Sequence, residues 1–352
     1  MSFQKLIPAL TYMHTGPGFS RIGQWLKHFD VEFYRTHPHW EGHADLEQFD
    51  HEHLRRHFIE TGWREGRAYS RFLHSFIDPD FYCREYPELG LNSPQDAARH
   101  WMYEGFYEGR IPNAVTKDVL ESEFHLFQFG KVGSKSIEQA LRVAGHDRTI
   151  LHLHWPSDML TTYPDCMFSY EEVVARDPEK PIRFITGVRD PFERIISGYF
   201  QSNPNVAQAG SIKTVGEISD AIVTSYFSSG QVDWILGWFA HQFFRGIDVF
   251  SSDFDKSAGY TVLECNHAKV FLYRMENLPH LEEPLSRFTG LPIRLQRVNT
   301  ATDKAYSGLY KEVIETLRFS QADVDLVVNS QLVRHFYSEQ EIDHMRERWT
   351  AK

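Results

Sequence analysis

A glycine-rich segment near residue 130 combines the residue types that bind an anion. Residues 130–136 read GKVGSKS, after the apolar run Phe124–Phe129 and before a helical pattern that begins at Ile137. A strand, a tight turn and a helix N-terminus in this order direct free N–H groups and the helix dipole to one point. Two glycines allow close approach, while the lysines and serines add charge and hydroxyl donors. The spacing differs from G-x-x-x-x-G-K-[ST], so we predict another kind of anion-binding loop, with an ordinary capped helix as the alternative.

A second cluster of charged residues follows the apolar run Ile182–Val188. Residues 189–200 read RDPFERIISGYF, in which the Asp-Pro pair suits a helix N-cap and first helical position. Arg194 and Ser197 lie three apart and share a face of this helix. Arg189 stands at the carboxyl end of the strand, where open α/β sheets bind ligands. The alternative is a structural Arg–Asp pair beside an exposed serine.

Two histidines supply candidates for a general base. Residues 151–156 read LHLHWP, so His152 and His154 project to the same face of a strand that ends at the same crevice. A pKa near 6.5 suits proton abstraction at neutral pH. We favour His154 over His152, because it lies nearer the strand end. Glu276 and His335 are the other candidates, and His335 is equally suited to a packed core.

From Phe124 onward, short apolar runs alternate with helical stretches along the sequence, and these elements would position the charged motifs. This alternation predicts an α/β domain in which a central parallel sheet carries helices on its faces. The segment Ile111–Ala114 reads as a linker, and Ala305–Trp349 is mostly helical in pattern. The predicted strands are Phe124–Phe129, Ile150–Leu153, Ile182–Val188 and Lys269–Tyr273, and the predicted helices include Ser136–Ala144, Glu193–Phe200 and Val232–Phe244.

Two copies of a short repeat precede this domain. One opens with FDVEFY at Phe29 and the other with IDPDFY at Ile77; they close with HFIETGWREGR and HWMYEGFYEGR, respectively. The pattern resembles a repeat attached to many bacterial glycosyltransferases and surface-polysaccharide enzymes. We predict three parts: an extension at 1–28, a helical repeat module for packing or interaction at 29–113, and a catalytic domain at 114–352. Trp63, Trp101 and Phe106 are expected to form small cores, with a glycan- or partner-binding arm as the alternative.

Composition narrows the class of protein. The chain has 352 residues and a formal charge of −11, which disfavours nucleic-acid binding through a basic face. Three scattered cysteines form neither a disulfide framework nor a zinc pattern and suit a reducing compartment. The N-terminus lacks a leader pattern, and no run of about 20 apolar residues could span a membrane. We therefore expect a cytoplasmic protein, with no metal predicted.

Taken together, the two charged motifs resemble those of sulfotransferases that use 3′-phosphoadenosine-5′-phosphosulfate (PAPS), especially carbohydrate sulfotransferases. Their loop looks like P-K-x-G-S-T-S and their second motif like R-D-P-x-x-R-x-x-S-x-Y. This chain departs at Gly130, in place of proline, and at Lys135, in place of threonine. The resemblance implies a P-loop-like three-layer sulfotransferase fold. It also implies that Arg189 and Ser197 bind the 3′-phosphate, and that the 5′-phosphosulfate is bound by Lys131, Val132, Gly133, Ser134, Lys135 and Ser136.

The resemblance also suggests which residues catalyse sulfuryl transfer. Sulfuryl transfer is an in-line displacement that needs cations on the leaving oxygens and a base for the acceptor hydroxyl. Lys131 is expected to act on the bridging oxygen, and the His-x-His sequence resembles the catalytic histidines of some glycan sulfotransferases. Further similarity over Glu123–Trp349 points to a bacterial capsular-polysaccharide-synthesis sulfotransferase family. Ala240 departs from it, since an acidic residue is expected there.

Other classes of protein remain in view. A kinase-like phosphotransferase would need a Walker-type Lys-Ser/Thr that the loop lacks, and a glycosyltransferase is suggested by the repeats alone. A non-catalytic polysaccharide-assembly protein is the third alternative, against which the intact loop argues. The expected partners are a carbohydrate acceptor and, through the repeats, polysaccharide-assembly enzymes. Acceptor residues are expected in loops such as Gln201–Thr214.

Overall fold

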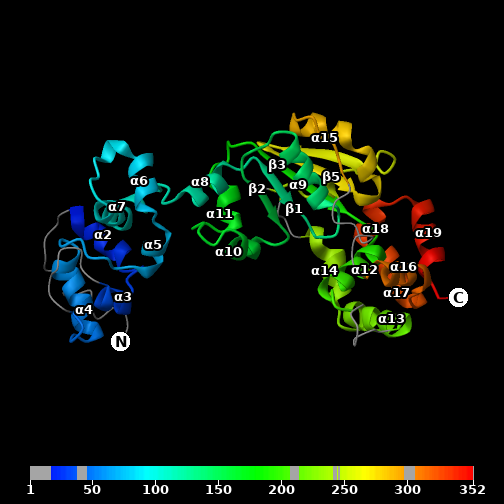
Figure 1. The fold of residues 1–352 in the computed structure, drawn as a ribbon, viewed down its shortest axis with the longest axis horizontal. Helices are drawn as coiled ribbons and strands as arrows, with labels where there is room; N and C mark the ends of the chain where they lie inside the picture. Colours follow the sequence, from blue (N-terminus) through cyan, green and yellow to red (C-terminus); the bar gives the residue numbers. More distant parts are fainter. Residues whose placement is uncertain are drawn as a thin grey trace. The chain divides into compact units, whose positions relative to one another are not determined.

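The computed structural model describes residues 17–37, 46–206, 214–240, 244, 246–296 and 306–351. The chain divides into two compact units (Figure 1). Unit 1 extends to Lys117 and includes Tyr163–Met167, and unit 2 comprises Asp118–Thr162 and Phe168–Lys352. None of the described helices is long and apolar enough to cross a membrane.

Unit 1 is built from short helices, and five of those described start at a side chain that accepts a hydrogen bond from a backbone N–H three residues on. Asp30 and Asp78 do so in corresponding positions of the two repeats, as do Asp50 and Ser93 at the second helices, and Ser70 at α5. The helices are α2 (Pro17–Trp25), α3 (Val31–Thr36), α4 (His51–His57), α5 (Arg71–Phe76), α6 (Pro79–Glu85) and α7 (Pro94–His100), with a 3₁₀ turn at Pro87–Leu89. α8 (Ala114–Glu121) contains the boundary between the units.

The repeated Tyr, His and Gly residues form one contact in each copy. Tyr34 Oη lies 2.7 Å from His57 Nδ1, and Tyr82 Oη lies 3.0 Å from His100 Nδ1. Both second helices end in a π-helical turn, Phe58–Gly62 and Trp101–Gly105. A Cβ atom on either terminal glycine would lie about 2 Å from the tyrosine hydroxyl, at 1.8 and 2.0 Å. The tyrosine hydroxyls can therefore occupy these positions only because the two residues have no side chain.

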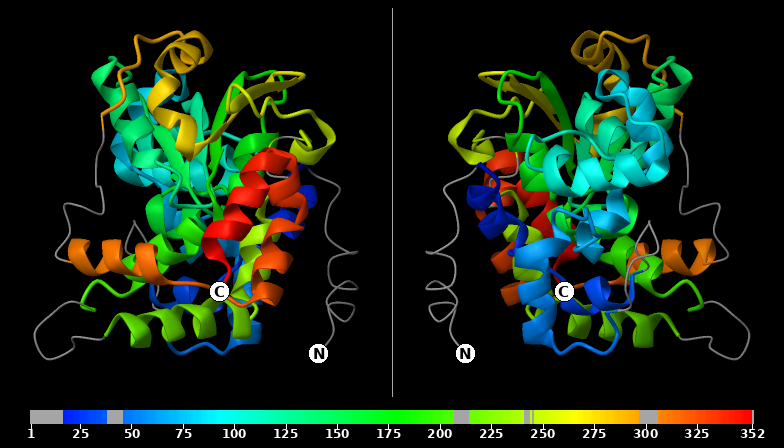
Figure 2. Two further views of the ribbon diagram at one scale, coloured as in Figure 1. Left: turned by 90° about the vertical axis from the view of Figure 1, so that its right-hand side faces the viewer. Right: turned by 90° about the vertical axis from the view of Figure 1, so that its left-hand side faces the viewer.

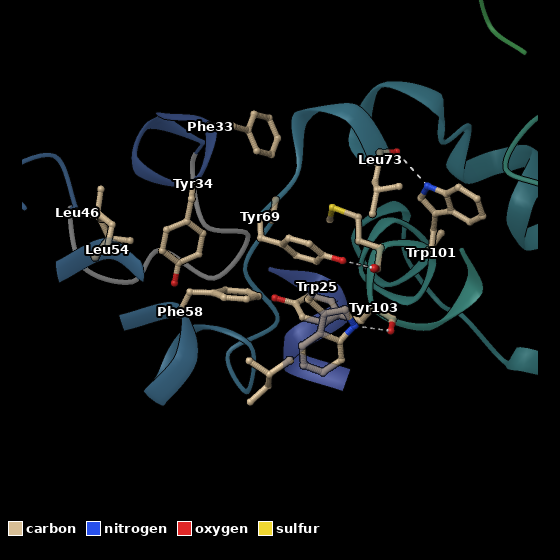
Figure 3. Packing of buried hydrophobic residues seen from close by; sticks show 14 of the residues in the cluster. Trp25, Phe33, Tyr34, Leu46, Leu54, Phe58, Tyr69, Leu73, Trp101 and Tyr103 are labelled. Carbon is tan, nitrogen blue, oxygen red and sulfur yellow. Dashed lines mark hydrogen bonds between the residues drawn. The ribbon is translucent and has the colours of Figure 1, made fainter. Parts of the chain in front are cut away.

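The aromatic side chains of unit 1 form its core (Figure 3). Trp101 is fully buried and donates to the carbonyl oxygen of Leu73 at 2.9 Å. Trp63 and Phe106 are partly buried and pack against the same core. The predicted core role therefore describes Trp101 fully, whereas Trp63 keeps exposed ring surface.

We expect Gly105→Ala to lower the free energy of unfolding of unit 1 by about 1–3 kcal/mol, because Tyr82 is buried and cannot retreat without strain. Gly23→Ala is the matched control: no atom lies within 4 Å of its Cβ position, and alanine favours its helix. Calorimetric unfolding of the full chain measures both. Adding Tyr82→Phe should restore part of the loss, and a fully stable Gly105→Ala protein would contradict this account of the motif.

Unit 2 is a mixed α/β structure around a five-stranded sheet of order β2-β1-β3-β5-β4. The strands are β1 (Phe124–Phe127), β2 (Ile150–Leu153), β3 (Ile182–Val188), β4 (Tyr260–Cys265) and β5 (Ala268–Arg274). β1 pairs in parallel with β2 and β3, and β3 with β5. The predicted parallel sheet needs one correction: β4 pairs antiparallel with β5. A tight turn with Asn266 at φ 51° joins the two strands, and the edge position leaves β4 without a long apolar run.

Helices cover both faces of the sheet. Phe124 and Leu126 of β1 share a cluster with α9 and α15, while the alternate residue Phe127 packs on Tyr170 and Trp238. Of the C-terminal helices, α16 contacts α12, while α17, α18 and α19 pack on one another (Figure 2, orange-red to red). The helices are α9 (Ser134–Val143), α10 (Met159–Thr162), α11 (Tyr170–Ala175), α12 (Pro191–Ser202), α13 (Val215–Val223), α14 (Gln231–Gly237), α15 (Glu282–Thr289), α16 (Ser307–Thr316), α17 (Gln321–Val328), α18 (Gln331–Phe336) and α19 (Glu339–Trp349). A π-helical turn at Thr224–Ser228 and 3₁₀ turns at Pro156–Asp158, Trp238–Ala240, Val249–Ser251 and Met275–His280 complete the unit.

The strand order creates one preferred ligand position. The chain leaves β1 for β2 on one side and returns across β1 to β3 on the other. In open α/β sheets ligands bind outside the carboxyl ends of the strands at such a switch point, here between β1 and β3. Both charged motifs begin at these two strand ends.

Candidate functional site

The loop after β1 has an unusual backbone. Gly130, Lys131 and Gly133 all have positive φ angles, of 83°, 66° and 84°. The strain lies at Lys131, because a left-handed backbone conformation costs a residue with a side chain roughly 1–2 kcal/mol, whereas glycine adopts it freely. Gly133 is the N-cap of α9 and provides no side-chain cap. The first turn of α9 therefore has N–H groups, those of Ser134 and Lys135, that the N-cap residue does not satisfy.

Residues from β3, β5 and the turn that follows hold this loop in place. Tyr273 is fully buried and its hydroxyl donates to the carbonyl oxygen of Val132 at 2.7 Å. Gly187 makes room for that ring, because a Cβ there would lie 2.5 Å from Tyr273 Cζ. Leu278 packs on Gly133, 2.6 Å from where a Cβ would lie. The strained loop is thus fixed by packing from distant parts of the chain.

Arg194 of α12 places a buried positive charge beneath the loop. Its side chain donates from Nη2 to the carbonyl oxygen of Phe129 at 3.0 Å, and its guanidinium lies over the rings of Phe129 and Trp234 at 5.2 and 4.9 Å. Among the described residues, its Nε has no hydrogen-bond partner and its guanidinium forms no ion pair with a carboxylate. Burial lowers the pKa of Arg194 to about 10. A buried cation without a counter-charge indicates a site for an anion.

Arg189, which the resemblance assigns to the 3′-phosphate, already uses part of its guanidinium for contacts within the protein. Its Nη2 donates to Glu193 at 2.8 Å and its Nη1 to the carbonyl oxygen of Lys131 at 3.5 Å. Arg348 pairs with the other oxygen of Glu193 at 3.0 Å. Burial alone would raise the pKa of Glu193, but the two arginines outweigh it and lower that pKa. Ser197 is partly buried on the same helix.

Carboxyl groups support the start of α12. Asp190 caps the helix and accepts a hydrogen bond from Trp349 Nε1 at 3.1 Å. Glu276 accepts from the backbone N–H of Asp190 at 2.7 Å and from the Tyr337 hydroxyl at 3.2 Å. Burial, followed by the charges of Glu193 and Glu276, raises the pKa of Asp190 to about 7. Glu276 thus connects the start of α12 to Tyr337.

His154 lies beside both the loop and Arg194. Its Nδ1 is 2.7 Å from the carbonyl oxygen of Gln128, so the neutral ring carries its proton on Nδ1 and keeps a lone pair on Nε2. A Cβ on Gly130 would lie 3.8 Å from the His154 ring and 4.0 Å from Arg194 Nη2. Loss of hydration lowers the pKa of His154, and the nearby His152 and Arg194 charges act in the same direction. A neutral imidazole of this tautomer can accept a proton.

His152 has a different environment. Its Nδ1 lies 2.7 Å from a carboxylate oxygen of Glu138 on α9, while its buried Nε2 has no hydrogen-bond partner in the described part of the chain. The two imidazole rings are 5.6 Å apart. His152 therefore ties β2 to α9, and His154 has the better position for chemistry.

The other predicted site residues lie together at the end of β1 and in the first turn of α9. Val132 is fully buried, so only its backbone could contact a ligand, whereas Lys135 is exposed. Ser134 is buried, and Lys131, Gly133 and Ser136 are intermediate. His335 lies apart, against Phe250 and Phe336, in agreement with its packed alternative.

The sequence interpretation missed two features of this site. The sequence placed Arg194 on the same helix face as Ser197, but we assigned it no role. Its burial, which only the structure shows, makes it a candidate anion-binding residue. Trp155 and Trp234 lie 5.8 Å apart beside His154, with Trp234 36% exposed. Their spacing along the chain gives no signal that they meet. Among the described residues, no group of three or more His, Cys, Asp or Glu side chains could hold a metal ion.

Comparison with known proteins relates part of unit 2 to polysaccharide synthesis. Residues 217–338 match a family model described as "putative capsular polysaccharide synthesis protein". The matched segment contains Trp234, Tyr273 and Glu276, and the glycine-rich loop lies outside it. Searches of curated proteins and of solved structures found no match.

Proposed function

We propose that this protein transfers a sulfuryl group from PAPS to a hydroxyl group of a carbohydrate in polysaccharide synthesis. The observation that carries the proposal is the buried guanidinium of Arg194, which has no carboxylate partner among the described residues and lies beneath the loop. An anion bound there would receive this charge and the N–H groups of α9 together.

The donor set suits a nucleotide with two separate anionic groups. The 5′-phosphosulfate would occupy the loop 130–136 with Arg194 beneath it. The 3′-phosphate would bind near Arg189 and Ser197 on the neighbouring strand end and helix. Arg189 uses some of its five N–H donors on Glu193 and Lys131, so others remain for a phosphate.

The proposed transfer needs a base and a stabilised leaving group. His154 Nε2 takes the proton of the acceptor hydroxyl while that oxygen forms a bond to sulfur. The bond between sulfur and the bridging oxygen breaks, and the electron pair leaves with the 5′-phosphate of adenosine 3′,5′-bisphosphate. Lys131 and Arg194 offset the charge that develops on this phosphate.

Two observations support a sugar as the acceptor. The family match concerns capsular polysaccharide synthesis. Trp155 and Trp234 also provide ring surface beside His154, and sugar C–H groups pack well on such surfaces.

The test is calorimetric binding of three nucleotides: adenosine 3′,5′-bisphosphate, its 2′,5′ isomer and ADP. We expect the 3′,5′ compound to bind at least tenfold more tightly than the isomer, which carries equal charge. Arg189→Ala should remove that preference, whereas the exposed Arg287→Ala should keep it. Equal affinities for all three nucleotides, or absence of binding, would move the assignment to a kinase-like or a non-catalytic protein.

A further inference from the structure

A cleft in unit 1 has the size and lining of a ligand site. Its volume is about 770 Å³, within the range of about 300–1,000 Å³ typical of such sites. It forms where α2 and the two repeats meet. The lining includes Trp63 and Arg64 from the first repeat, Arg99 and Glu104 from the second, and Arg21 from α2.

Three arginines surround this cleft without forming ion pairs to carboxylates of the described residues. Arg64 stacks over Trp63 with its guanidinium carbon 4.9 Å from the ring centre, and it donates to the carbonyl oxygen of Glu60. Arg99 lays its methylene groups against Gly66, where a Cβ would collide at 2.3 Å. Arg21, Arg64 and Arg99 are exposed. Such guanidinium groups are suited to carboxylate or sulfate groups of a ligand.

The aromatic floor of the cleft is rigid. Trp25 is buried and donates to the carbonyl oxygen of Tyr103 at 3.1 Å, while Trp63 donates to that of Ile59 at 3.1 Å. The two indoles lie 5.7 Å apart. Arg64 and Trp25 cover part of the Trp63 ring, but Trp63 is only partly buried, so the remaining ring surface can contact apolar C–H groups of a ligand.

The rim offers acceptors as well as donors. Asp96 and Glu104 line the cleft together with Asn92 and His100. The Asp96 carboxylate accepts from the Ser93 hydroxyl at 2.8 Å, which occupies part of its capacity. Sugar hydroxyls donate and accept at once, so a rim of both kinds suits them.

We propose that this cleft binds an acidic carbohydrate, with its carboxylate or sulfate groups on the arginines and its ring C–H groups on Trp63. The proposal does not depend on the transfer reaction, since every residue in it belongs to unit 1. The overall charge of −11 would repel anions, so binding must come from this local cluster rather than from a general attraction.

The experiment titrates the full chain with three tetrasaccharides: a galacturonate, a sulfated galactan and neutral maltotetraose. We expect at least one acidic tetrasaccharide to bind, tenfold or more tighter than maltotetraose. The double variant Arg21→Gln/Arg64→Gln should weaken that binding at least tenfold. Arg84→Gln is the matched control, an exposed arginine of unit 1 outside the cleft. The two acidic ligands distinguish carboxylate from sulfate recognition.

Several outcomes would overturn the proposal. These are binding unchanged in the double variant, equal binding of maltotetraose, and absence of binding by both acidic ligands. Complete competition by inorganic sulfate at the same concentration would reduce the cleft to an ion site and overturn its assignment to sugars. All three arginines are exposed, so the variants should fold, and calorimetric unfolding checks this. Nucleotide affinity of unit 2, measured in the same variants, tests the transferase proposal separately.

Discussion

Arg194→Met should weaken binding of adenosine 3′,5′-bisphosphate at least a hundredfold without destabilising the protein. The wild-type side chain is 8% exposed, and burial lowers its pKa well below the usual value for arginine, to about 10. A shift of this size means that burying the charge destabilises the folded protein by roughly 3 kcal/mol. Methionine fills a similar volume without the charge. We therefore expect the free energy of unfolding to stay constant or rise by up to about 3 kcal/mol.

Loss of the proposed charge-assisted contact to the nucleotide should weaken binding at least a hundredfold, about 3 kcal/mol. Calorimetric titration and calorimetric unfolding of the same preparation measure both quantities. Arg287→Met, at an exposed arginine of α15, is the control and should change neither. Unaltered nucleotide binding in Arg194→Met would show that the buried charge has another purpose. Strong destabilisation would show that its contacts to Phe129 and Trp234 are structural.

His154→Ala should lower kcat by about 10²–10⁴, the usual contribution of a general base, with nucleotide affinity unchanged. The measurement is transfer of ³⁵S from labelled PAPS to the best acceptor in a panel of neutral and acidic oligosaccharides. His152→Ala is the comparison and should cost much less, because its ring contacts Glu138. A larger loss in His152→Ala than in His154→Ala would reverse the assignment of the base.

The pH profile of the wild-type protein gives a second readout for His154. The base works only when neutral, so activity should fall as the pH drops through its pKa. Loss of hydration lowers that pKa below 6.5, which places the midpoint of the acid limb below pH 6.5. The limb should disappear from the residual activity of His154→Ala. A midpoint above pH 6.5, or an unchanged limb in the variant, would contradict this role.

Much of unit 2 could be predicted from the sequence because its strands are continuous apolar runs. The predicted strands Ile150–Leu153 and Ile182–Val188 have the observed bounds, and Lys269–Tyr273 lies within β5. β4 was missed, since an edge strand exposed on one side lacks such a run. The turn residues Asn266 and His267 were the available signal for the hairpin.

Predictions about the site depended on a different kind of information. Local spacing was enough to place the loop 130–136 and the helix from Pro191 each after a strand, and the structure shows that these strands, β1 and β3, are neighbours. It could not reveal that Arg194 is buried without a carboxylate partner among the described residues, or that Glu193 occupies Arg189. The cleft of unit 1 was equally hidden, because it is made by residues from both repeats and α2.

The contact between Gly187 and Tyr273 has an evolutionary consequence. The tyrosine holds the loop through the carbonyl oxygen of Val132, and it fits only because position 187 has no side chain. Neither residue can change alone without moving the loop. In related chains the two positions should therefore covary: an aromatic residue at 273 should accompany glycine at 187, and a larger residue at 187 should accompany a smaller one at 273. A substitution at one of these two positions would therefore be retained only together with a compensating substitution at the other.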